Sequence, residues 1–433
     1  MNILIITPFY KHDRNIASVR WTNIGIRLAK RHNVIIVTQP HDDMDMDTSI
    51  ERDEDSILVA RINQKTRYER IAVKHFGGAT GDDWQTSAGN GEPVQVNDSI
   101  KRKLKNRLLF ASMKKKAKQY AKEIENNVIP KDMKIDVVIS SACPFIEMLF
   151  GYELKKRIGC KWISDFRDLP FIEDNCDDTH IQKRIMQKSL AEADAIVTIA
   201  NKGKEKLADG IVADPGRIHV IRNGFSLTDA RKITTIQDHK LHIVHTGSLY
   251  GGQRKADLLF ESIIKARESE PEFDYILECA GGNNKTLVET AKQYGEESHI
   301  NNHGFIPRGQ ALDMQSKADV FLALVINRPG SLVAKLYEYM LNQKPVICIT
   351  CGNDQENSEE TEFVQQVGLG IAVEESNGSS AVTELAEYLI KQWKLKNDGR
   401  ELFYLPNNEM INGFNHDSIS AEIEQLCSSI CKE

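Results

Sequence analysis

The sequence predicts an α/β protein made of two doubly wound domains. Its 433 residues are enough for two or three domains with cores of their own, at about 150 residues per domain. Short, strongly apolar segments alternate with segments whose apolar residues recur at helical spacing, which is typical of parallel sheets covered by helices on both faces. This alternation stops at a polar stretch near residues 226–240 and then begins again. We therefore expect two similar domains with a cleft between them.

The expected strands follow from the apolar segments. In the first half a helix over residues 16–32 separates the first two strands. The strands of this half are residues 2–7, 33–38, 56–62, 135–140, 161–164 and 195–199. Those of the second half are residues 241–246, 275–279, 299–304, 320–324 and 346–350. The expected domains are residues 1–225 and 226–410, followed by residues 411–433 as a helix that packs back towards the first domain.

Composition narrows the class of protein. Lys and Arg number 56 against 62 Asp and Glu, and 41% of residues are hydrophobic, which disfavours both a dedicated nucleic-acid-binding protein and a disordered one. No segment approaches the roughly 18 uninterrupted apolar residues that span a bilayer. The first residues, MNILIITPFY, have the pattern of a buried strand and not of a signal peptide. We therefore expect a cytoplasmic protein with reduced thiols.

Three polar segments interrupt the alternation. The acidic residues 42–55 favour a solvated loop over a metal site, and the Gly-rich residues 77–99 favour a mobile loop. Residues 101–118 contain nine Lys or Arg and no acid, together with an apolar stretch, and so predict a basic helix. Two interpretations remain open for that helix: it lies on an anionic membrane surface, or it packs its apolar face into the first domain.

The most informative loop of the second half is RPGSLVAKLYEYMLNQKPV, residues 328–346. Gly330 and Ser331 are predicted to open a helix whose unpaired N–H groups bind an anion. Lys335, one turn further, would add a full positive charge, and Glu338 would share its helical face. The alternative is an amphipathic helix with an exposed Lys–Glu pair.

A second loop, HTGSLYGGQRK at residues 245–255, follows an expected strand. Gly247 and Ser248 allow a ligand to approach the backbone closely, and Arg254 and Lys255 bring cations to the start of the next helix. Such a loop suits a diphosphate.

Two segments of the first half are weaker candidates. In WISDFRDLP, residues 162–170, the charged Arg167 and Asp168 either touch the transferred group or the acceptor, or form a salt-bridged knot with Asp165. In the other segment, Ser18 and Arg20 lie on the first helix, where Arg20 is expected to hold an anionic group.

Several segments together resemble one known family in the order of its motifs. They are MNILIITPFY with ASVRW, DVVISSACPF, KWISDFRDLP, ADAIVTIANKGKEKL, IHVIRNGF, LHIVHTGSLYGG, HGFIPRGQ and AKLYEYMLNQKPVI. The chain resembles the family 4 glycosyltransferases of the GT-B fold, especially bacterial enzymes of surface-polysaccharide assembly. The resemblance covers most of the chain apart from residues 42–130 and the last 70. It implies two Rossmann-like domains facing across a cleft, with a nucleotide-sugar donor held mainly by the second.

The resemblance also implies roles for particular residues. Glu338 matches the family glutamate that binds the ribose hydroxyls, and Arg254 and Lys335 become candidates for the diphosphate. Arg167 and Asp168 match a position where many relatives carry a His-Asp pair. The segment Gly304–Pro307 would meet the base, with Gly304, Phe305 and Ile306 as its binding candidates. One departure is clear, because Gly330 stands where the family often has a glutamate that contacts the donor sugar.

The implied activity is a retaining hexosyl or N-acetylhexosaminyl transfer, with Arg167, Asp168 and Lys335 as the catalytic candidates. Its acceptor would be a saccharide or a lipid-linked saccharide in surface-polysaccharide synthesis, and neither a metal nor another cofactor is required. Residues 101–118 would bring the protein to the inner face of the cell membrane. Two alternatives share the fold: a catalytically silent nucleotide-sugar-binding subunit, favoured by Gly330, and a nucleotide-sugar 2-epimerase.

Overall fold

The computed structural model describes most of the chain and divides it into two compact units. The first comprises Met1–Arg222 together with His416–Glu433, and the second comprises Asn223–Asn415. The described residues are 1–11, 17–40, 49–62, 99–142, 145–169, 179–249, 254–328, 330–352 and 358–432. The expected acidic loop lies outside them over residues 41–48, as does the Gly-rich loop over residues 77–98.

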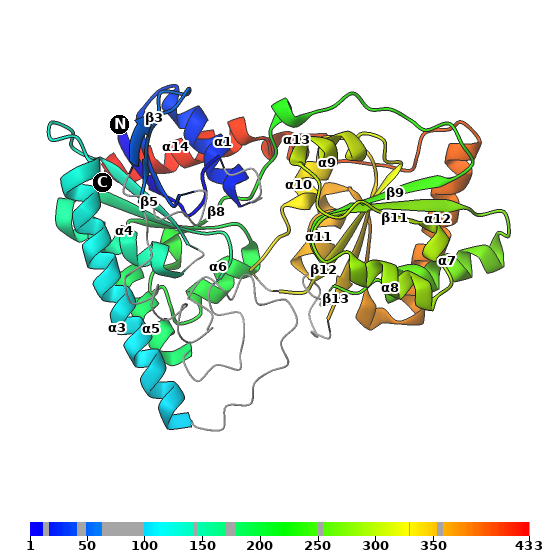
Figure 1. Cartoon of the computed structure of the whole chain (residues 1–433), viewed down its shortest axis with the longest axis horizontal. Coiled ribbons are helices and arrows are strands. Elements are labelled where there is room, and N and C mark those ends of the chain that lie inside the picture. Colours follow the sequence, from blue (N-terminus) through cyan, green and yellow to red (C-terminus); the bar gives the residue numbers. More distant parts are fainter. Residues whose placement is uncertain are drawn as a thin grey trace. The chain divides into compact units, whose positions relative to one another are not determined.

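An eight-stranded sheet forms the centre of the first unit (Figure 1), in the order β3-β4-β2-β1-β5-β6-β7-β8. All its neighbouring strands are parallel except β3 and β4, which are antiparallel. The strands are β1 Asn2–Ile6, β2 Asn33–Thr38, β3 Ser49–Arg52, β4 Leu58–Arg61, β5 Val137–Ala142, β6 Lys161–Phe166, β7 Ala195–Thr198 and β8 Ile218–Val220.

Helices cover both faces of this sheet because its strands are apolar on both sides. Leu4 and Ile6 of β1 belong to the core under one set of helices, whereas Ile3 and Ile5 belong to the core on the opposite face. On the first face lie α3 Ser99–Glu123, which continues into the π-helical η1 Ile124–Val128, with α4 Phe145–Ile158 and α5 Thr179–Leu190. On the second, α1 Ser18–Ala29 packs beside α14 His416–Lys432 (Figure 1). The unit also contains α6 Asn201–Ala208.

The terminal helix α14 joins the first unit through an apolar stripe. Ile419, Ile423, Leu426 and Ile430 recur every three or four residues and are buried in the same core as Trp21 of α1. An ion pair between Arg27 and Asp417 and a hydrogen bond between His32 and Glu424 accompany this packing.

The basic segment forms helix α3, as predicted. From residue 110 onward its apolar side chains turn inward, and Phe110, Met113 and Ala117 pack against the core of the first unit. Lys114 and Lys115 are exposed on the other side of the helix. The described apolar residues of this helix are therefore used in the protein's own core.

The second unit has a six-stranded, wholly parallel sheet in the order β11-β10-β9-β12-β13-β14. Its strands are β9 Leu241–Thr246, β10 Tyr275–Ala280, β11 Ile300–Asn302, β12 Val320–Ile326, β13 Val346–Cys351 and β14 Gly370–Glu374. Its helices are α7 Asp257–Ser269, α8 Lys285–Gln293, α9 Arg308–Gln315, α10 Lys335–Met340, α11 Glu359–Val367, α12 Ser379–Asn397 and α13 Asn408–Gly413.

Each predicted strand has a counterpart, and the three strands that were not predicted, β3, β8 and β14, are all edge strands. The structure corrects the acidic segment in particular, because Ser49–Arg52 is not a loop but pairs antiparallel with β4. An edge strand has one pairing partner and less burial, so its apolar pattern is weak. Among the residues described, no helix combines the length and apolar character needed to cross a membrane.

Candidate functional site

The strand order of the second unit places a switch point between β9 and β12. From β9 the chain proceeds outward to β10 and β11, and from β12 it proceeds the other way to β13 and β14. Ligands of such sheets bind beyond the carboxyl ends of the strands at this point. Gly247, which directly follows β9, has a φ of 123°. It therefore has a backbone conformation that a residue with a side chain rarely adopts.

Lys335 and Gly247 meet at this switch point. A Cβ atom placed on Gly247 would lie 3.1 Å from the Nζ atom of Lys335. Gly247 and Lys335, which belong to two loops predicted separately from the sequence, therefore lie side by side.

The start of the helix differs from the prediction. Helix α10 begins at Lys335, so Gly330 and Ser331 do not open it, and Lys335 is its first residue. Gly330 has a φ of 90°, which is not helical, and the Ser331 N–H donates to the Arg328 carbonyl at 3.0 Å. The predicted helix N-terminus at Gly330 and Ser331 is wrong, and positive charge in the site comes from side chains instead.

The ammonium group of Lys335 is buried without a hydrogen-bond partner among the described residues. Burial, followed by the charge of Arg254, lowers the pKa of Lys335 well below its usual value. Buried ammonium groups ordinarily pair with an anion, and no residue in the described part of the chain forms a hydrogen bond with this Nζ atom.

His245 and Arg254 complete what we call the basic cluster: His245, Arg254 and Lys335. The buried His245 ring donates from Nδ1 to the Leu322 carbonyl at 3.0 Å, whereas its Nε2 atom has no partner among the described residues. Burial, and then the positive charge that Lys335 carries when it is protonated, lower the pKa of His245 well below its usual value. Arg254 donates from Nη1 to the Ser248 carbonyl at 2.9 Å, which fixes it against the predicted loop.

Glu338 lies in the same short helix as Lys335 but has partners of its own. Its Oε1 atom is 2.6 Å from Nη1 of Arg308, and its Oε2 atom accepts from Nε2 of Gln315 at 3.1 Å. Arg308 also pairs with Asp229 at 2.7 Å. Burial opposes the charged form of Arg308, but the two carboxylates outweigh it and raise the pKa of this guanidinium.

The sequence interpretation did not identify Arg308, Gln315 or Asp229 as site residues. Arg308 could have been identified from the sequence, because it ends the HGFIPR segment, in which Gly304, Phe305 and Ile306 were candidates for binding the base. Gly304 has a φ of 61°, and its carbonyl accepts from the Gly281 N–H at 2.7 Å. Phe305 is 66% exposed.

Arg20 has a different environment from the one predicted. It is 4% exposed and donates from Nη2 to Oδ1 of Asp165 at 3.1 Å, and from Nη1 to the Arg222 carbonyl at 2.6 Å. The Asp165 carboxylate also accepts from the Trp21 indole at 2.9 Å and from the Ser141 hydroxyl at 3.0 Å. Arg20 thus belongs to the core of the first unit, and its expected role as a holder of an anionic ligand is corrected.

The remaining candidates of the first unit lie around the carboxyl end of β6. Arg167 is buried and donates to the Ala17 carbonyl at 3.2 Å. Ala17 directly precedes the buried Ser18, which is the first residue of α1. Asp168, the next residue, is exposed. The structure therefore brings Arg167 close to the start of α1, and it gives Asp165 the partners described above.

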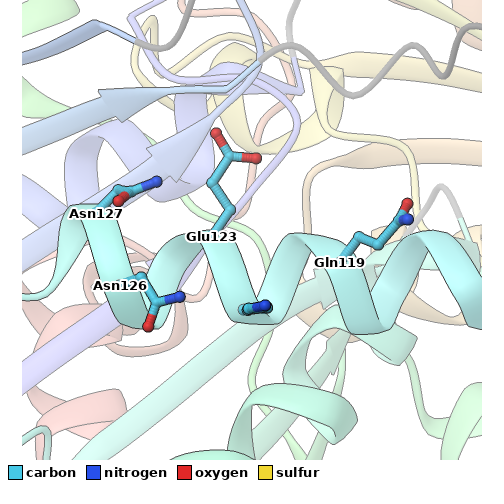
Figure 2. Close-up of a pocket in the computed structure, with 5 residues that line it drawn as sticks. Gln119, Glu123, Asn126 and Asn127 are labelled. Carbon is cyan, nitrogen blue, oxygen red and sulfur yellow. The ribbon is translucent and has the colours of Figure 1, made fainter.

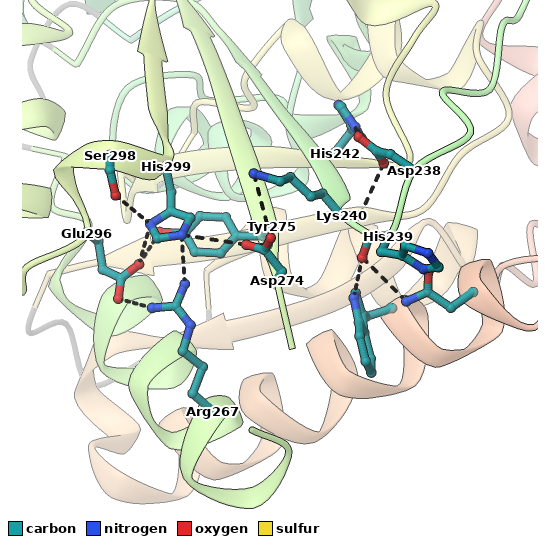
Figure 3. Close-up of polar contacts among 12 residues, drawn as sticks. Asp238, His239, Lys240, His242, Arg267, Asp274, Tyr275, Glu296, Ser298 and His299 are labelled. Carbon is teal, nitrogen blue, oxygen red and sulfur yellow. Dashed lines mark hydrogen bonds and ion pairs between the residues drawn. The ribbon is translucent and has the colours of Figure 1, made fainter. Parts of the chain in front are cut away.

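Two other polar regions lie away from these strand ends. A shallow depression on α3 and η1 is lined by Gln119, Lys122, Glu123, Asn126 and Asn127 (Figure 2). At the amino-terminal edge of the second sheet, Glu296 pairs with Arg267 and accepts from the Tyr275 hydroxyl at 3.0 Å, while His299 stacks on Tyr275 (Figure 3). The side chains of this second region satisfy one another, as expected of a structural network.

Known structures resemble the chain over its full length. Sucrose-phosphate synthase from Thermosynechococcus elongatus aligns with a TM-score of 0.63 and 13% identity, covering 99% of this chain and 98% of the other. The E. coli trehalose-6-phosphate protein bound with UDP-2-fluoro glucose aligns with a TM-score of 0.67 and 11% identity, covering 100% and 99%. The chain has the GT-B fold.

A third GT-B structure, the apo form of the lipopolysaccharide outer core galactosyltransferase WaaB, aligns with a TM-score of 0.60 and 13% identity and covers 99% of each chain. Residues 240–391 match the family described as Glycosyl transferases group 1. The matched region contains the basic cluster and Glu338. No curated protein matches the chain by sequence.

Proposed function

We propose that the protein is a retaining glycosyltransferase that takes its sugar from a nucleotide-diphosphate donor. The observation that carries the proposal is the buried, unpartnered Nζ atom of Lys335 beside Gly247, at the carboxyl end of β9. A diphosphate would supply an anionic partner for this Nζ atom, and Gly247 has no side chain that would keep it from the backbone. The family match over residues 240–391 supports the same conclusion.

In this proposal each part of the donor has its own residues in the second unit. Lys335, Arg254, Gly247 and Ser248 bind the diphosphate, and Glu338 binds the ribose hydroxyls. The base lies against residues 304–306. When the bond to the sugar breaks, negative charge grows on the leaving diphosphate, and Lys335 and Arg254 stabilise it in a site from which water is largely excluded.

The first unit would bind the acceptor. Asp168 is exposed directly after β6, and Arg167 precedes it with its guanidinium held near Ser18. We propose that this strand end faces the acceptor hydroxyl, with Arg167 and Asp168 as catalytic candidates. The transfer of a hexosyl or N-acetylhexosaminyl group to a saccharide or lipid-linked saccharide, in surface-polysaccharide synthesis, is the pathway that we propose.

Donor binding can be tested by thermal shift with UDP, GDP and ADP and their sugar conjugates, because a ligand that binds the folded state raises its stability. We expect one nucleotide series to raise the melting temperature of the wild type. Lys335→Ala should retain its fold, lose most of this shift and lose most donor-dependent turnover. Lys292→Ala, a change at an exposed lysine of helix α8, should behave as the wild type. Near-wild-type turnover of Lys335→Ala would refute the assignment.

A catalytically silent donor-binding subunit is the second candidate, and Gly330 favours it. Gly330 is buried and offers no carboxylate to a donor sugar. Binding of a nucleotide sugar without transfer or hydrolysis, across a broad panel of acceptors, would select this function. A sugar altered without any acceptor would instead indicate the epimerase.

We also propose that the exposed side of α3 contacts an anionic membrane at its cytoplasmic face. Lys114, Lys115 and Lys118 are exposed there, and they attract anionic lipid by charge while the apolar side chains stay in the core. Replacing all three by Gln should weaken binding to phosphatidylserine vesicles, most strongly at low salt. Gln at the exposed Lys131, Lys134 and Lys292 is the matched control. Equal vesicle binding by both triple variants would rule the contact out.

A further inference from the structure

Among the described residues, no group forms a hydrogen bond with the Nζ atom of Lys335. Arg254, from the segment before α7, and the buried His245, from β9, lie near enough to act on Lys335 electrostatically, as do the Cys348 thiol of β13 and Glu338 of its own helix, whose charge opposes the effect of Arg254. Glu338, on its own helix, directs its two carboxylate oxygens to Arg308 and Gln315.

The protonation state of Lys335 follows from this arrangement. A buried ammonium with no anionic partner, next to a guanidinium that is always charged, is strongly disfavoured relative to the neutral amine. Burial and Arg254 accordingly hold its pKa well below the usual value. A diphosphate placed at Gly247 would bring at least two negative charges to the cluster and reverse this preference.

We propose that Lys335 is an uncharged amine in the ligand-free protein and takes up one proton from solvent when the diphosphate of the donor binds. This inference rests on the proposed function and extends it: donor binding and charging of the site become a single event. The ammonium then neutralises the leaving diphosphate, and no standing charge has to be buried before the donor arrives.

Protonation of Lys335 on donor binding has two measurable consequences. Since the amine is neutral before binding and charged afterwards, binding consumes a proton, and affinity falls as pH rises. Between the lower pKa of the free site and the higher pKa of the occupied one, the fall approaches tenfold per pH unit. A lysine that was already charged would give neither effect.

Calorimetry of UDP binding, in two buffers with different heats of ionisation, measures the uptake directly. At about pH 8 UDP is fully ionised, since the second pKa of a phosphate is about 6, whereas an ordinary lysine, with a pKa of about 10.4, is already charged. Proton exchange by the ligand is thereby minimised. We expect the wild type to take up close to one proton, and GDP and ADP are measured in the same way should they bind more tightly.

Two lysine-to-arginine variants locate the proton. Lys335→Arg carries a permanent charge and should bind UDP without uptake, whereas Lys292→Arg, at an exposed lysine of helix α8, should match the wild type. If UDP binds the wild type without uptake, the proposal is overturned and the proposed function stands. If uptake persists in Lys335→Arg, the proton belongs to another group such as His245, and the proposal is again overturned. If none of the three nucleotides binds, the proposed function fails as well.

Discussion

Arg20 and Asp165 form a buried ion pair that joins the first helix of the first unit to its strand β6, with 3.1 Å between Nη2 and Oδ1. The two residues are 145 positions apart in the chain. Arg20 also donates to the carbonyls of Ile221 and Arg222, the last residues of that part of the unit. The pair therefore connects three distant segments of the first unit.

Breaking this pair should destabilise the first unit strongly. Asp165→Asn leaves the Arg20 guanidinium buried without its counter-ion, a change that costs about 3–5 kcal/mol. Urea unfolding followed by tryptophan fluorescence measures it, because Trp21 and Trp162 are both buried in this unit. The control, Glu125→Gln, breaks the partly exposed pair with Arg157 and should cost at most about 1 kcal/mol. Equal effects of the two variants would contradict the prediction.

Arg308 should orient Glu338 towards the ribose. In Arg308→Met the carboxylate loses its partner at 2.6 Å, and we expect UDP to bind about tenfold more weakly, or about 1.4 kcal/mol. The preference for UDP over 2′-deoxy-UDP should fall as well, which general destabilisation would not cause. Asp229→Asn, which removes the other partner of Arg308, should have a smaller effect. Strict additivity of Arg308→Met and Glu338→Gln in a double-mutant cycle would show that the two residues act independently.

Gly281 should be intolerant of any side chain because it lies against the loop that faces Lys335. It has a φ of 138°, and a Cβ atom there would lie 2.3 Å from the Gly247 carbonyl oxygen. Gly281→Ala should displace Gly247, lower the melting temperature and abolish the UDP thermal shift. Gly309→Ala, in helix α9 with nothing within 4 Å of its Cβ position, should be neutral or slightly stabilising. An unchanged UDP response in Gly281→Ala would refute the close contact.

The buried Glu360 should make stability depend on pH. Burial raises the pKa of this carboxyl from 4.5 to about 8, with Glu359 acting in the same direction. Between these two values the unfolded chain loses the proton and the folded chain keeps it, so the unfolding free energy of the wild type falls as pH rises. The slope contributed by this group is about 1.4 kcal/mol per pH unit, and it is absent below pH 4.5.

Glu360→Gln should remove that slope, so the variant gains stability relative to the wild type between pH 5 and pH 8. Urea unfolding at several pH values measures the difference. Glu362→Gln, an exposed position on the same helix, is the control and should follow the wild type. A gap between Glu360→Gln and the wild type that stayed constant with pH would exclude this role.

The local pattern of apolar residues was sufficient to predict the central strands. β2 and β9 begin and end at the predicted residues, since each is buried along nearly its whole length and its apolar run therefore matches the strand. The same alternation of strands and helices predicted two doubly wound units. The candidate loops were also recognisable, because Gly, Arg and Lys after a buried strand suit an anion whatever the rest of the fold does.

The tertiary structure determined the surroundings of the predicted residues, namely their burial and their partners. Whether Ser49–Arg52 is a strand depends on pairing with β4, and whether Arg20 binds a ligand depends on Asp165, so neither follows from neighbouring residues. Lys335 has the sequence context of an exposed helical lysine, yet its Nζ atom is buried and lies beside Gly247, at the end of β9. Residue type alone indicated a basic group there; its burial and the absence of a hydrogen-bond partner among the described residues come from contacts between segments about 90 residues apart.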